Sequence, residues 1–358
     1  MFNSLFWEKS MGYKVFIGSF HIPFSIVSLL IGVMSLNAIA KTQFSAKEAI
    51  SKVYKEVLSE DKKMSEQERG KVADYIPELA AANPEYFGIS IATSNGSVVS
   101  VGDSEIPFSI QSISKPFIYG LALKDHNDDK GFSVNNRVGL NATGHAFNSI
   151  LSITEKEDHR QNPMVNAGAI QVTSYVKKGS ENNKWTHALN FINSLTDGKT
   201  FLGEKVYRSE AATNQNNQKI ANLLFDYKMI DDNPMDALDR YTKACSIMIT
   251  SKQLALMGAT LANGGINPLT KKRVLSANQV RDVLSQMVVS GLYENSGAWW
   301  TEVGLPTKSG VAGGLLAVFP HKYAIAVFSP RLDKAGNTVR GQAVIKKISQ
   351  MYNLHMLH

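Results

Sequence analysis

The chain has 358 residues, of which 44% are hydrophobic and 19% charged, without an internal repeat or a low-complexity tract, so it can bury one large core or two closely packed subdomains. The single cysteine, Cys245, excludes an intramolecular disulfide, and its apolar neighbours predict a packed core thiol. The net charge of +7 is spread over short basic clusters without interleaved aromatic residues or zinc-ligand spacing, so we expect a solvated basic surface and no nucleic-acid site.

The first 40 residues differ in kind from the rest. Residues 15–40 contain no Asp, Glu, Lys or Arg, residues 24–36 form an apolar block, and Ala38-Ile39-Ala40 has the form of a cleavage site. We therefore predict a signal peptide over residues 1–40, a mature chain that starts at Lys41, and an exported, periplasmic protein, with the cytoplasm as the alternative location. An uncleaved membrane anchor and a buried N-terminal segment are the other interpretations of these residues. We expect no membrane contact for the mature domain.

After Lys41, the predicted elements follow one another in chain order. Residues 45–58 fit an amphipathic helix capped by Ser45, with Glu48 completing a capping box. Residues 86–93 and 97–101, joined by Asn95-Gly96, fit a hairpin, and residues 106–110 resemble a strand. A mainly helical middle follows, with predicted helices over residues 112–124, 166–178, 185–195, 211–227, 235–250, 252–262 and 277–290. The chain closes with a second hairpin over residues 315–319 and 323–328 and a helix over residues 336–351.

This order of elements predicts the fold class. Strands at both ends with helices between them indicate an α+β protein, in which an antiparallel sheet is built from both chain ends and flanked by terminal helices, with an inserted helical subdomain. We expect the domain to cover residues 41–358, with its sheet parts at about 41–110 and 300–358 and its helical part at about 111–299. The active site should lie where the two parts meet.

Two separated motifs carry the first chemical signal. Ser112 and Lys115 are three residues apart, so on a helix they lie on one face and can act as nucleophile and base. By itself this pattern also fits a capping serine followed by a solvated lysine. Far downstream, Lys308-Ser309-Gly310 leads into a predicted strand, where small residues let a ligand approach the backbone. Together the motifs are typical of the serine β-lactamase and penicillin-binding protein superfamily, although a glycine-rich hairpin beside an unrelated helix would give the same pair.

Longer phrases resemble one family. They span from about residue 65 to the C-terminus and occur at residues 74–79, 111–116, 162–170, 209–210, 261–265 and 304–314. In content and order they are similar to the bacterial and mitochondrial-type glutaminases, which have a β-lactamase/transpeptidase-like fold. The resemblance implies an L-glutamine amidohydrolase that forms L-glutamate and ammonia through a serine acyl-enzyme, in glutamine metabolism and glutamate biosynthesis. It also implies L-glutamine as the substrate, a homo-oligomer (dimer or tetramer), and no metal or organic cofactor.

Amide hydrolysis requires a nucleophile, a proton shuttle and donors for the oxyanion. Ser112 is the predicted nucleophile and Lys115 the candidate base. An unperturbed lysine has a pKa of about 10.4, so Lys115 has to be desolvated or placed beside other cations, and Lys308 is positioned in the motif to supply part of that field.

The resemblance adds further catalytic residues. It implies that Tyr75 and Tyr293 lie beside the nucleophile, where either phenol can relay a proton to departing ammonia. It also implies an oxyanion hole made by the backbone N–H groups of Ser112 and Val311. A half-buried aromatic residue with a satisfied hydroxyl is the alternative role for each tyrosine.

Recognition of the substrate's α-carbon end requires an anionic acceptor for the ammonium and neutral donors for the carboxylate. The resemblance implies Glu210 as the acceptor and Asn166, Asn217 and Tyr241 as donors, with Ser112, Tyr293 and Val311 also contacting substrate. Two further asparagines stand within three residues of Asn217, so a shift of register would move that assignment. A charge at a helix N-terminus is the alternative role for Glu210.

Two other functions fit parts of the sequence. A β-lactam hydrolase or D,D-peptidase shares the two short motifs, but no Ser-Asp-Asn occurs in the chain and the phrase at residues 162–170 is foreign to that branch. A non-catalytic amino-acid-binding protein could keep the fold, but the presence of Ser112, Lys115 and Lys308 argues against it. Ammonia release from glutamine separates these hypotheses. None of the eight histidines stands in metal-ligand spacing.

Overall fold

The computed structural model describes residues 46–179, 183–198 and 200–358. The predicted signal peptide, its alternatives and the Ser45 cap fall outside these residues. Ser45–His358 forms one compact unit. Within the described ranges, no helix has both the length and the apolar character required to cross a membrane.

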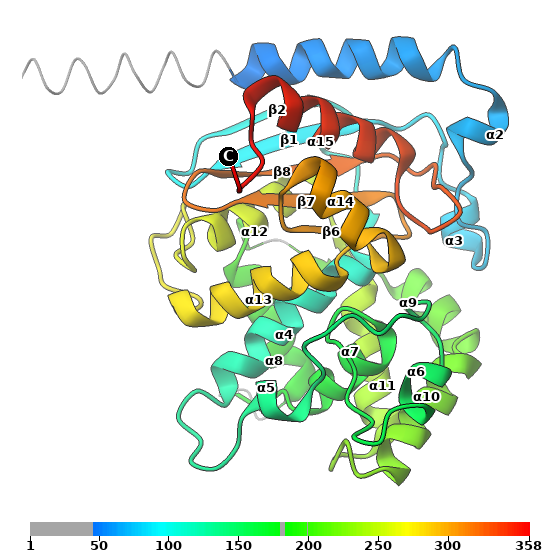
Figure 1. Cartoon of the computed structure of the whole chain (residues 1–358), viewed down its shortest axis with the longest axis vertical. Coiled ribbons are helices and arrows are strands. Elements are labelled where there is room, and N and C mark those ends of the chain that lie inside the picture. Colours follow the sequence, from blue (N-terminus) through cyan, green and yellow to red (C-terminus); the bar gives the residue numbers. More distant parts are fainter. Residues whose placement is uncertain (1–45, 180–182, 199) are drawn as a thin grey trace, which may run out of the picture. The chain divides into compact units, whose positions relative to one another are not determined.

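A five-stranded antiparallel sheet is built from both ends of this unit (Figure 1). Its spatial order is β2-β1-β8-β7-β6, and the strands are β1 (Gly88–Thr93), β2 (Val98–Gly102), β6 (Thr307–Gly310), β7 (Gly314–Phe319) and β8 (Tyr323–Phe328). In the centre, β1 pairs directly with β8, so that Gly88 stands opposite Phe328. The predicted α+β class, with an antiparallel sheet assembled from both chain ends, is therefore confirmed.

Helices cover both faces of this sheet. A helix over residues 46–61 and α15 (Val339–Tyr352) lie on the same face, while α12 (Ser251–Ala262) packs on β1, β7 and β8 (Figure 1). The alternation of side chains along β1 explains the two cores: Ile89 and Ile91 belong to the cluster with the terminal helices, and Ala92 belongs to the cluster that contains α12.

The middle of the chain is mainly helical, as predicted. Its longer helices are α4 (Ser114–Asp125), α7 (Asn166–Ser174), α8 (Lys184–Ser194), α9 (Glu204–Ala212), α10 (Gln215–Asp226), α11 (Pro234–Cys245), α13 (Ala277–Ser290) and α14 (Ser296–Val303). Short helices are α2 (Glu66–Arg69), α3 (Pro77–Ala80), α5 (Val134–Arg137) and α6 (Leu151–Thr154). A core cluster joins α7, α10 and α11 and holds these helices together.

Three predicted helices differ from the structure by more than three residues at one end, and the first of them, predicted over residues 166–178, ends at Ser174. The predicted helix over residues 235–250 ends at Cys245 and is followed by the strand β5 (Ile247–Ile249). In a second small sheet, β5 pairs with β3 (Phe108–Ser109) and β4 (Phe201–Leu202). The predicted helix over residues 211–227 is in fact the end of α9 and all of α10, separated by a short break.

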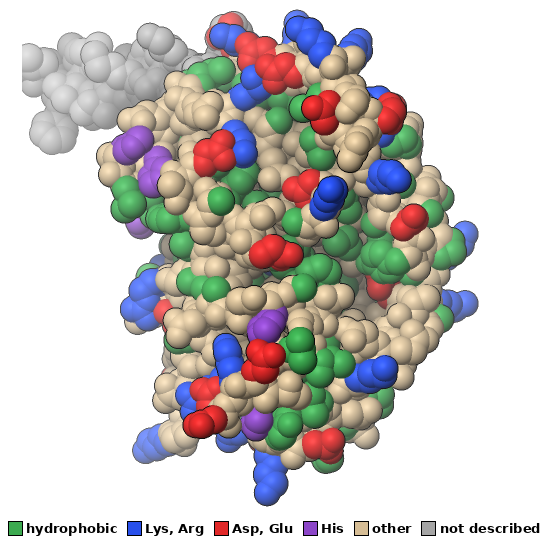
Figure 2. All heavy atoms as spheres, turned by 45° about the vertical axis from the view of Figure 1, so that its right-hand side comes forward, with side chains coloured by type: hydrophobic (Ala, Val, Ile, Leu, Met, Phe, Trp, Pro, Cys, Tyr) green, Lys and Arg blue, Asp and Glu red, His purple; other side chains and the backbone are tan. Residues whose placement is uncertain are grey.

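The charged side chains are dispersed on the face that Figure 2 shows, where Lys and Arg lie among Asp and Glu. Ion pairs among the described residues include Lys184 with Asp232 at 2.7 Å and Lys346 with Glu302 at 2.7 Å. This is the distribution of a solvated surface, on which opposite charges are mixed.

Candidate active site

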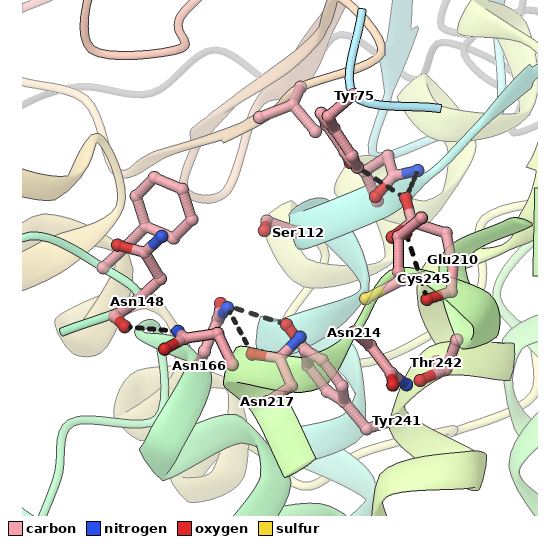
Figure 3. A pocket seen from close by; sticks show the side chains of 15 residues that line it. Tyr75, Ser112, Asn148, Asn166, Glu210, Asn214, Asn217, Tyr241, Thr242 and Cys245 are labelled. Atoms are coloured by element: carbon pink, nitrogen blue, oxygen red, sulfur yellow. Dashed lines mark hydrogen bonds between the residues drawn. The ribbon is translucent and has the colours of Figure 1, made fainter. Parts of the chain in front are cut away.

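A pocket of about 380 Å³ lies between residues of the helical middle and Val311, the residue that follows β6. Figure 3 shows the side chains that line it. Among the residues predicted from sequence, those that line it are Tyr75, Ser112, Asn166, Glu210, Asn217, Tyr241 and Val311. The other three, Lys115, Tyr293 and Lys308, are almost fully buried and contact one another or the lining residues. The fold thus brings all the predicted site residues together.

Ser112 lies in a 3-10 turn, η1 (Gln111–Ile113), between β3 and α4. We expected Ser112 in the first turn of an α-helix, but it lies in the 3-10 turn that directly precedes α4. Gln111 has a φ of 49°, which turns the chain sharply out of the strand. Lys115 stands in the first turn of α4, and its Nζ is 2.9 Å from Ser112 Oγ, so the predicted contact between the hydroxyl and the amine forms.

Lys115 lies in an enclosed, mostly aromatic environment. Its Nζ is 5.9 Å from the ring centroids of Phe147, Tyr241 and Tyr293, and it donates to Asn166 Oδ1 at 2.7 Å. Burial lowers the pKa of Lys115 to about 8, because water no longer stabilises the charged form, while Cys245 has a smaller, opposite effect. With this pKa, about a tenth of Lys115 is neutral at pH 7 and about half at pH 8.

Lys308 is buried next to Tyr293. Its Nζ donates to the backbone carbonyls of Gly291 at 2.9 Å and Ser309 at 3.0 Å, and lies 4.2 Å from the centroid of the Tyr293 ring. Burial, and then the positive charge of Lys115, holds the pKa of Lys308 well below its usual range. The pKa of Lys115 itself is lowered by burial and not by Lys308, so the field expected from Lys308 is not found there.

The Tyr293 hydroxyl is buried and has no hydrogen-bond partner among the described residues. Burial raises the pKa of Tyr293 to about 12, and the side chains of Ser112 and Ser309 act in the opposite direction. A buried phenol next to Ser112 without a committed partner can donate to a ligand that enters the pocket.

Gly310 allows the end of β6 to lie close to the turn that contains Ser112. A Cβ at this position would lie 2.9 Å from the Ile110 carbonyl oxygen and 3.1 Å from Ile113, which is closer than real Cβ atoms pack. Because glycine has no side chain, the end of β6 lies against η1. Val311, the next residue, consequently lines the pocket together with Ser112.

Among the described residues that line this pocket, Glu210 supplies the only charged side chain. Its Oε1 accepts from the Tyr75 hydroxyl at 2.9 Å and from Gln111 Nε2 at 3.0 Å. Burial, and then Glu78, raises the pKa of Glu210, while Tyr75 and Gln111 act in the opposite direction. Glu210 stands in the last turn of α9, so its alternative role as a helix N-terminal charge is wrong.

Asn166 links Lys115 to the opposite wall of the pocket. Its Oδ1 accepts from Lys115 at 2.7 Å and from the Tyr241 hydroxyl at 3.0 Å, and its Nδ2 donates to Asn217 Oδ1 at 3.0 Å (Figure 3). Of the three neighbouring asparagines on this segment, Asn217 is the one that contacts Asn166, since the side chains of the other two bond elsewhere.

Several lining residues have no role in the sequence analysis. These are Gln111, Phe147, Asn148, Thr213, Asn214, Asn216, Thr242 and Cys245. Gln111 could have been found from sequence because it directly precedes Ser112. Phe147 and Asn148 lie in a segment without a recognisable sequence motif, so no sequence signal identifies them. Cys245 is buried as predicted, and it also lines the pocket, where its Sγ lies 3.8 Å from Ser114 Oγ.

Known proteins identify the family of this arrangement. The family model described as Glutaminase matches residues 70–357. The chain belongs to the glutaminase family. A glutaminase of Microcystis aeruginosa is 43% identical over 296 residues, which cover 83% of this chain and 86% of the relative. The family region includes both Tyr75 and Val311, so every residue that lines the pocket of this glutaminase lies within it.

Solved structures resemble this glutaminase as well. A probable glutaminase, ybaS, has a TM-score of 0.79 at 38% identity, with 86% of this chain and 97% of that chain covered. Mglu in its glutamate form has a TM-score of 0.77 at 39% identity, with 84% of this chain and 68% of that chain covered. The glutaminase fold of the chain is therefore matched over most of its length.

Proposed function

We propose that this glutaminase hydrolyses the side-chain amide of L-glutamine to L-glutamate and ammonia, with Ser112 as the nucleophile. The observation that carries the proposal is the 2.9 Å contact between Ser112 Oγ and Nζ of the buried Lys115, at the wall of a pocket with a single carboxylate. Family membership supports the activity, and the relative solved in its glutamate form supports glutamate as the product.

In the first half of the reaction, Ser112 is acylated. Neutral Lys115 takes the hydroxyl proton while Ser112 Oγ attacks the amide carbon, and the backbone N–H groups of Ser112 and Val311 hold the resulting oxyanion. Lys115 then returns the proton to the departing nitrogen, directly or through Tyr293, whose buried hydroxyl has no other partner among the described residues. The C–N bond breaks, ammonia leaves, and a γ-glutamyl ester remains on Ser112.

In the second half, water replaces ammonia. The water oxygen attacks the ester carbon while Lys115 takes a proton from that water. The backbone N–H groups of Ser112 and Val311 hold the second oxyanion. The ester C–O bond then breaks, the proton passes back to Ser112 Oγ, and L-glutamate is released. The Tyr75 hydroxyl donates to Glu210 at 2.9 Å, and we propose that Tyr75 acts through the substrate's ammonium end.

Substrate recognition follows from the distribution of charge. Glu210 pairs with the α-ammonium through the carboxylate oxygen that Tyr75 and Gln111 leave free. Asn166 and Asn217 supply neutral N–H donors for the α-carboxylate, and Tyr241 supplies a third when its hydroxyl turns from Asn166 Oδ1 to the substrate. No Lys or Arg lines the described pocket, so the carboxylate is bound by hydrogen bonds alone.

Replacing the nucleophile tests this mechanism. Purified Ser112→Ala should release ammonia from glutamine at least about 10³-fold more slowly than the wild type, while it still binds glutamate. With wild-type enzyme, hydroxylamine should intercept the ester and form γ-glutamyl hydroxamate. Retention of a tenth of the turnover by Ser112→Ala would remove Ser112 from the role. Asparagine and a chromogenic cephalosporin assayed in parallel separate the activity from those of an asparaginase and a β-lactamase.

We further propose the β-lactamase/transpeptidase-like version of this fold, with residues of about 111–299 as its helical insertion. The placement of η1 and α4 beside the edge strand β6 supports it, because β6 carries the Lys-Ser-Gly motif next to the Ser-x-x-Lys turn. We also propose that the enzyme is a homo-oligomer, either a dimer or a tetramer. Light scattering coupled to size-exclusion chromatography would measure its molar mass.

The location of the protein is a separate proposal. We infer from the Ala38-Ile39-Ala40 sequence and the preceding charge-free run that the enzyme is exported and starts at Lys41. Expression from the native start in a Gram-negative host, followed by N-terminal sequencing of the periplasmic enzyme, tests it. Active enzyme in the cytosol that begins at Met1 or Met11 would contradict export.

A further inference from the structure

A second cavity, of about 470 Å³, lies next to the catalytic pocket and shares no lining residue with it. Ser109 and Ala312 line the second cavity, whereas Gln111 and Val311 line the first, so the two adjoin along the same short segments of chain. The proposed reaction uses no part of this second cavity.

Aromatic side chains make up much of its wall. The rings of Phe108 and Phe328 are stacked with centroids 4.3 Å apart, and Tyr86 stands 6.3 Å from Phe328. Phe201, on the short strand β4, also lines the cavity and is 56% exposed. A flat apolar group entering here would contact aromatic rings and cover an exposed one.

One polar atom in this wall has no partner. Glu78, on α3, lines the cavity, and its Oε2 is buried without a hydrogen bond to any described residue. A buried carboxylate oxygen is costly unless a donor or a cation approaches it. The other charged residues of the lining, Glu204 and Lys205, are exposed on the surface, so Glu78 is the fixed charge inside.

We propose that this cavity is a second ligand site, which binds a small aromatic cation. The apolar body of the ligand lies against Phe108 and Phe328, and its amidinium or ammonium group pairs with the Glu78 carboxylate at the cavity wall. Aromatic walls favour a cation over a neutral molecule of the same shape, because the ring faces carry partial negative charge. The volume suits a molecule of one or two rings.

Calorimetric titration of the full chain with benzamidine tests the site, with benzamide as the neutral analogue and benzoate as the anionic one. The titrations contain saturating L-glutamate, which occupies the catalytic pocket and prevents binding to Glu210 there. For so small a ligand we expect a dissociation constant of about 0.1 to 1 mM for benzamidine, at least tenfold weaker binding of benzamide, and no binding of benzoate.

Two variants locate the binding. Glu78→Gln should weaken benzamidine binding by at least about tenfold, the value of a charge-assisted hydrogen bond, whereas Glu204→Gln at the exposed rim should change it less than about twofold. Ala82→Trp, which fills the cavity without removing the charge, should also prevent binding. Glutaminase activity and the thermal midpoint of Glu78→Gln show whether the variant is folded.

The proposal fails if benzamidine shows no saturable binding to the wild type up to about 10 mM, or if folded Glu78→Gln binds it as tightly. It also fails if L-glutamate displaces benzamidine, since the catalytic pocket would then be the site. None of these outcomes depends on the roles proposed for Ser112 or Lys115.

Discussion

The side-chain amide of Asn166 orients the Lys115 amine. Asn166 Oδ1 accepts from both Lys115 and Tyr241, so the amide oxygen faces the amine and the Nδ2 faces Asn217. A neutral amine can donate one N–H to Asn166 and still direct its lone pair at the Ser112 hydroxyl. The amide therefore orients the base and contacts the substrate-binding wall at the same time.

The pKa of Lys115, lowered to about 8, predicts how activity depends on pH. The neutral amine is the active form, so kcat/KM for glutamine should rise about tenfold per pH unit at acidic pH and level off near pH 8. A pH profile of the wild type measures this. Activity that is constant between about pH 6 and pH 9 would exclude Lys115 as the titrating base.

A pair of alanine variants isolates Lys115 from its helix. Lys115→Ala should lose activity by at least about 10³-fold, as expected for a member of a nucleophile pair. Lys124→Ala, exposed on the same helix α4, should keep both activity and the pH profile. Equal losses in the two variants would indicate a destabilised helix instead.

Glu210→Gln tests recognition of the ammonium. Losing one charge-assisted hydrogen bond costs about 1.5 to 3 kcal/mol, so kcat/KM for glutamine should fall about ten- to a hundredfold. N-acetylglutamine lacks the positive charge, and the variant should discriminate against it much less than the wild type does. Glu204→Gln, in the first turn of the same helix, is the control. If the ratio of kcat/KM for glutamine to that for N-acetylglutamine is unchanged in the variant, Glu210 does not bind the ammonium.

At the scale of elements, the errors in the helices predicted over residues 235–250 and 211–227 have different physical origins. The residues of β5 are apolar and follow α11 directly, so a helical pattern continues through them, and only pairing with the distant strands β3 and β4 makes them extended. The break between α9 and α10 occurs at Thr213 and Asn214, polar residues that compete with helix hydrogen bonds. By contrast, α13, which begins with a Ser276 capping box, has the predicted bounds.

The site likewise contains residues that local sequence identifies and residues that only tertiary contacts bring into the pocket. Residues inside long phrases, such as Tyr75, Ser112 and Asn166, could be named from sequence because the phrases identify the family. Phe147 and Asn148 could not, since they reach the pocket through a loop whose position depends on contacts such as the 2.8 Å bond from Asn166 N to Phe147 O. The tilted contact between the rings of Phe147 and Tyr293, with centroids 4.6 Å apart, is equally a product of tertiary structure.

Gly310→Ala tests the approach of β6 to η1. The new Cβ would clash with the Ile110 carbonyl, so the end of β6 has to move away and carry the Val311 N–H with it. Losing alignment of one oxyanion donor should lower kcat about 10²- to 10³-fold, with a smaller change in KM. Gly297→Ala, with open space around its Cβ position, should retain full activity. A normal kcat in Gly310→Ala would show that Val311 does not hold the oxyanion.

For the molecule as a whole, a charged network joins the first described helix to the last one. Arg340 on α15 is 1% exposed and pairs with Asp61, 3% exposed, at 2.6 Å, and with Glu85 at 2.7 Å. Arg69 also pairs with Asp61, at 3.0 Å. Arg340 lowers the pKa of Asp61 against the opposing effect of burial, which shows how strongly the pair depends on both partners.

Arg340→Met should destabilise the protein by about 3 to 5 kcal/mol, because Asp61 is left buried without its main partner. The double variant Arg340→Met/Asp61→Leu should recover a large part of that loss, since an apolar pair needs no compensation. Urea unfolding of the two variants and the wild type measures both changes. A double variant less stable than Arg340→Met alone would show that the network stabilises through more than charge pairing.

The direct pairing of β1 with β8 also sets when the enzyme becomes active during its synthesis. The ribosome makes Ser112 and Lys115 early, but β1 lacks its central neighbour, and Ser112 lacks Val311, until almost the whole chain has emerged. Such long-range pairing has to wait for the end of translation. A nascent chain therefore carries the nucleophile without the surroundings that activate it, and glutamine in the compartment of synthesis meets no working site before the final strands are in place.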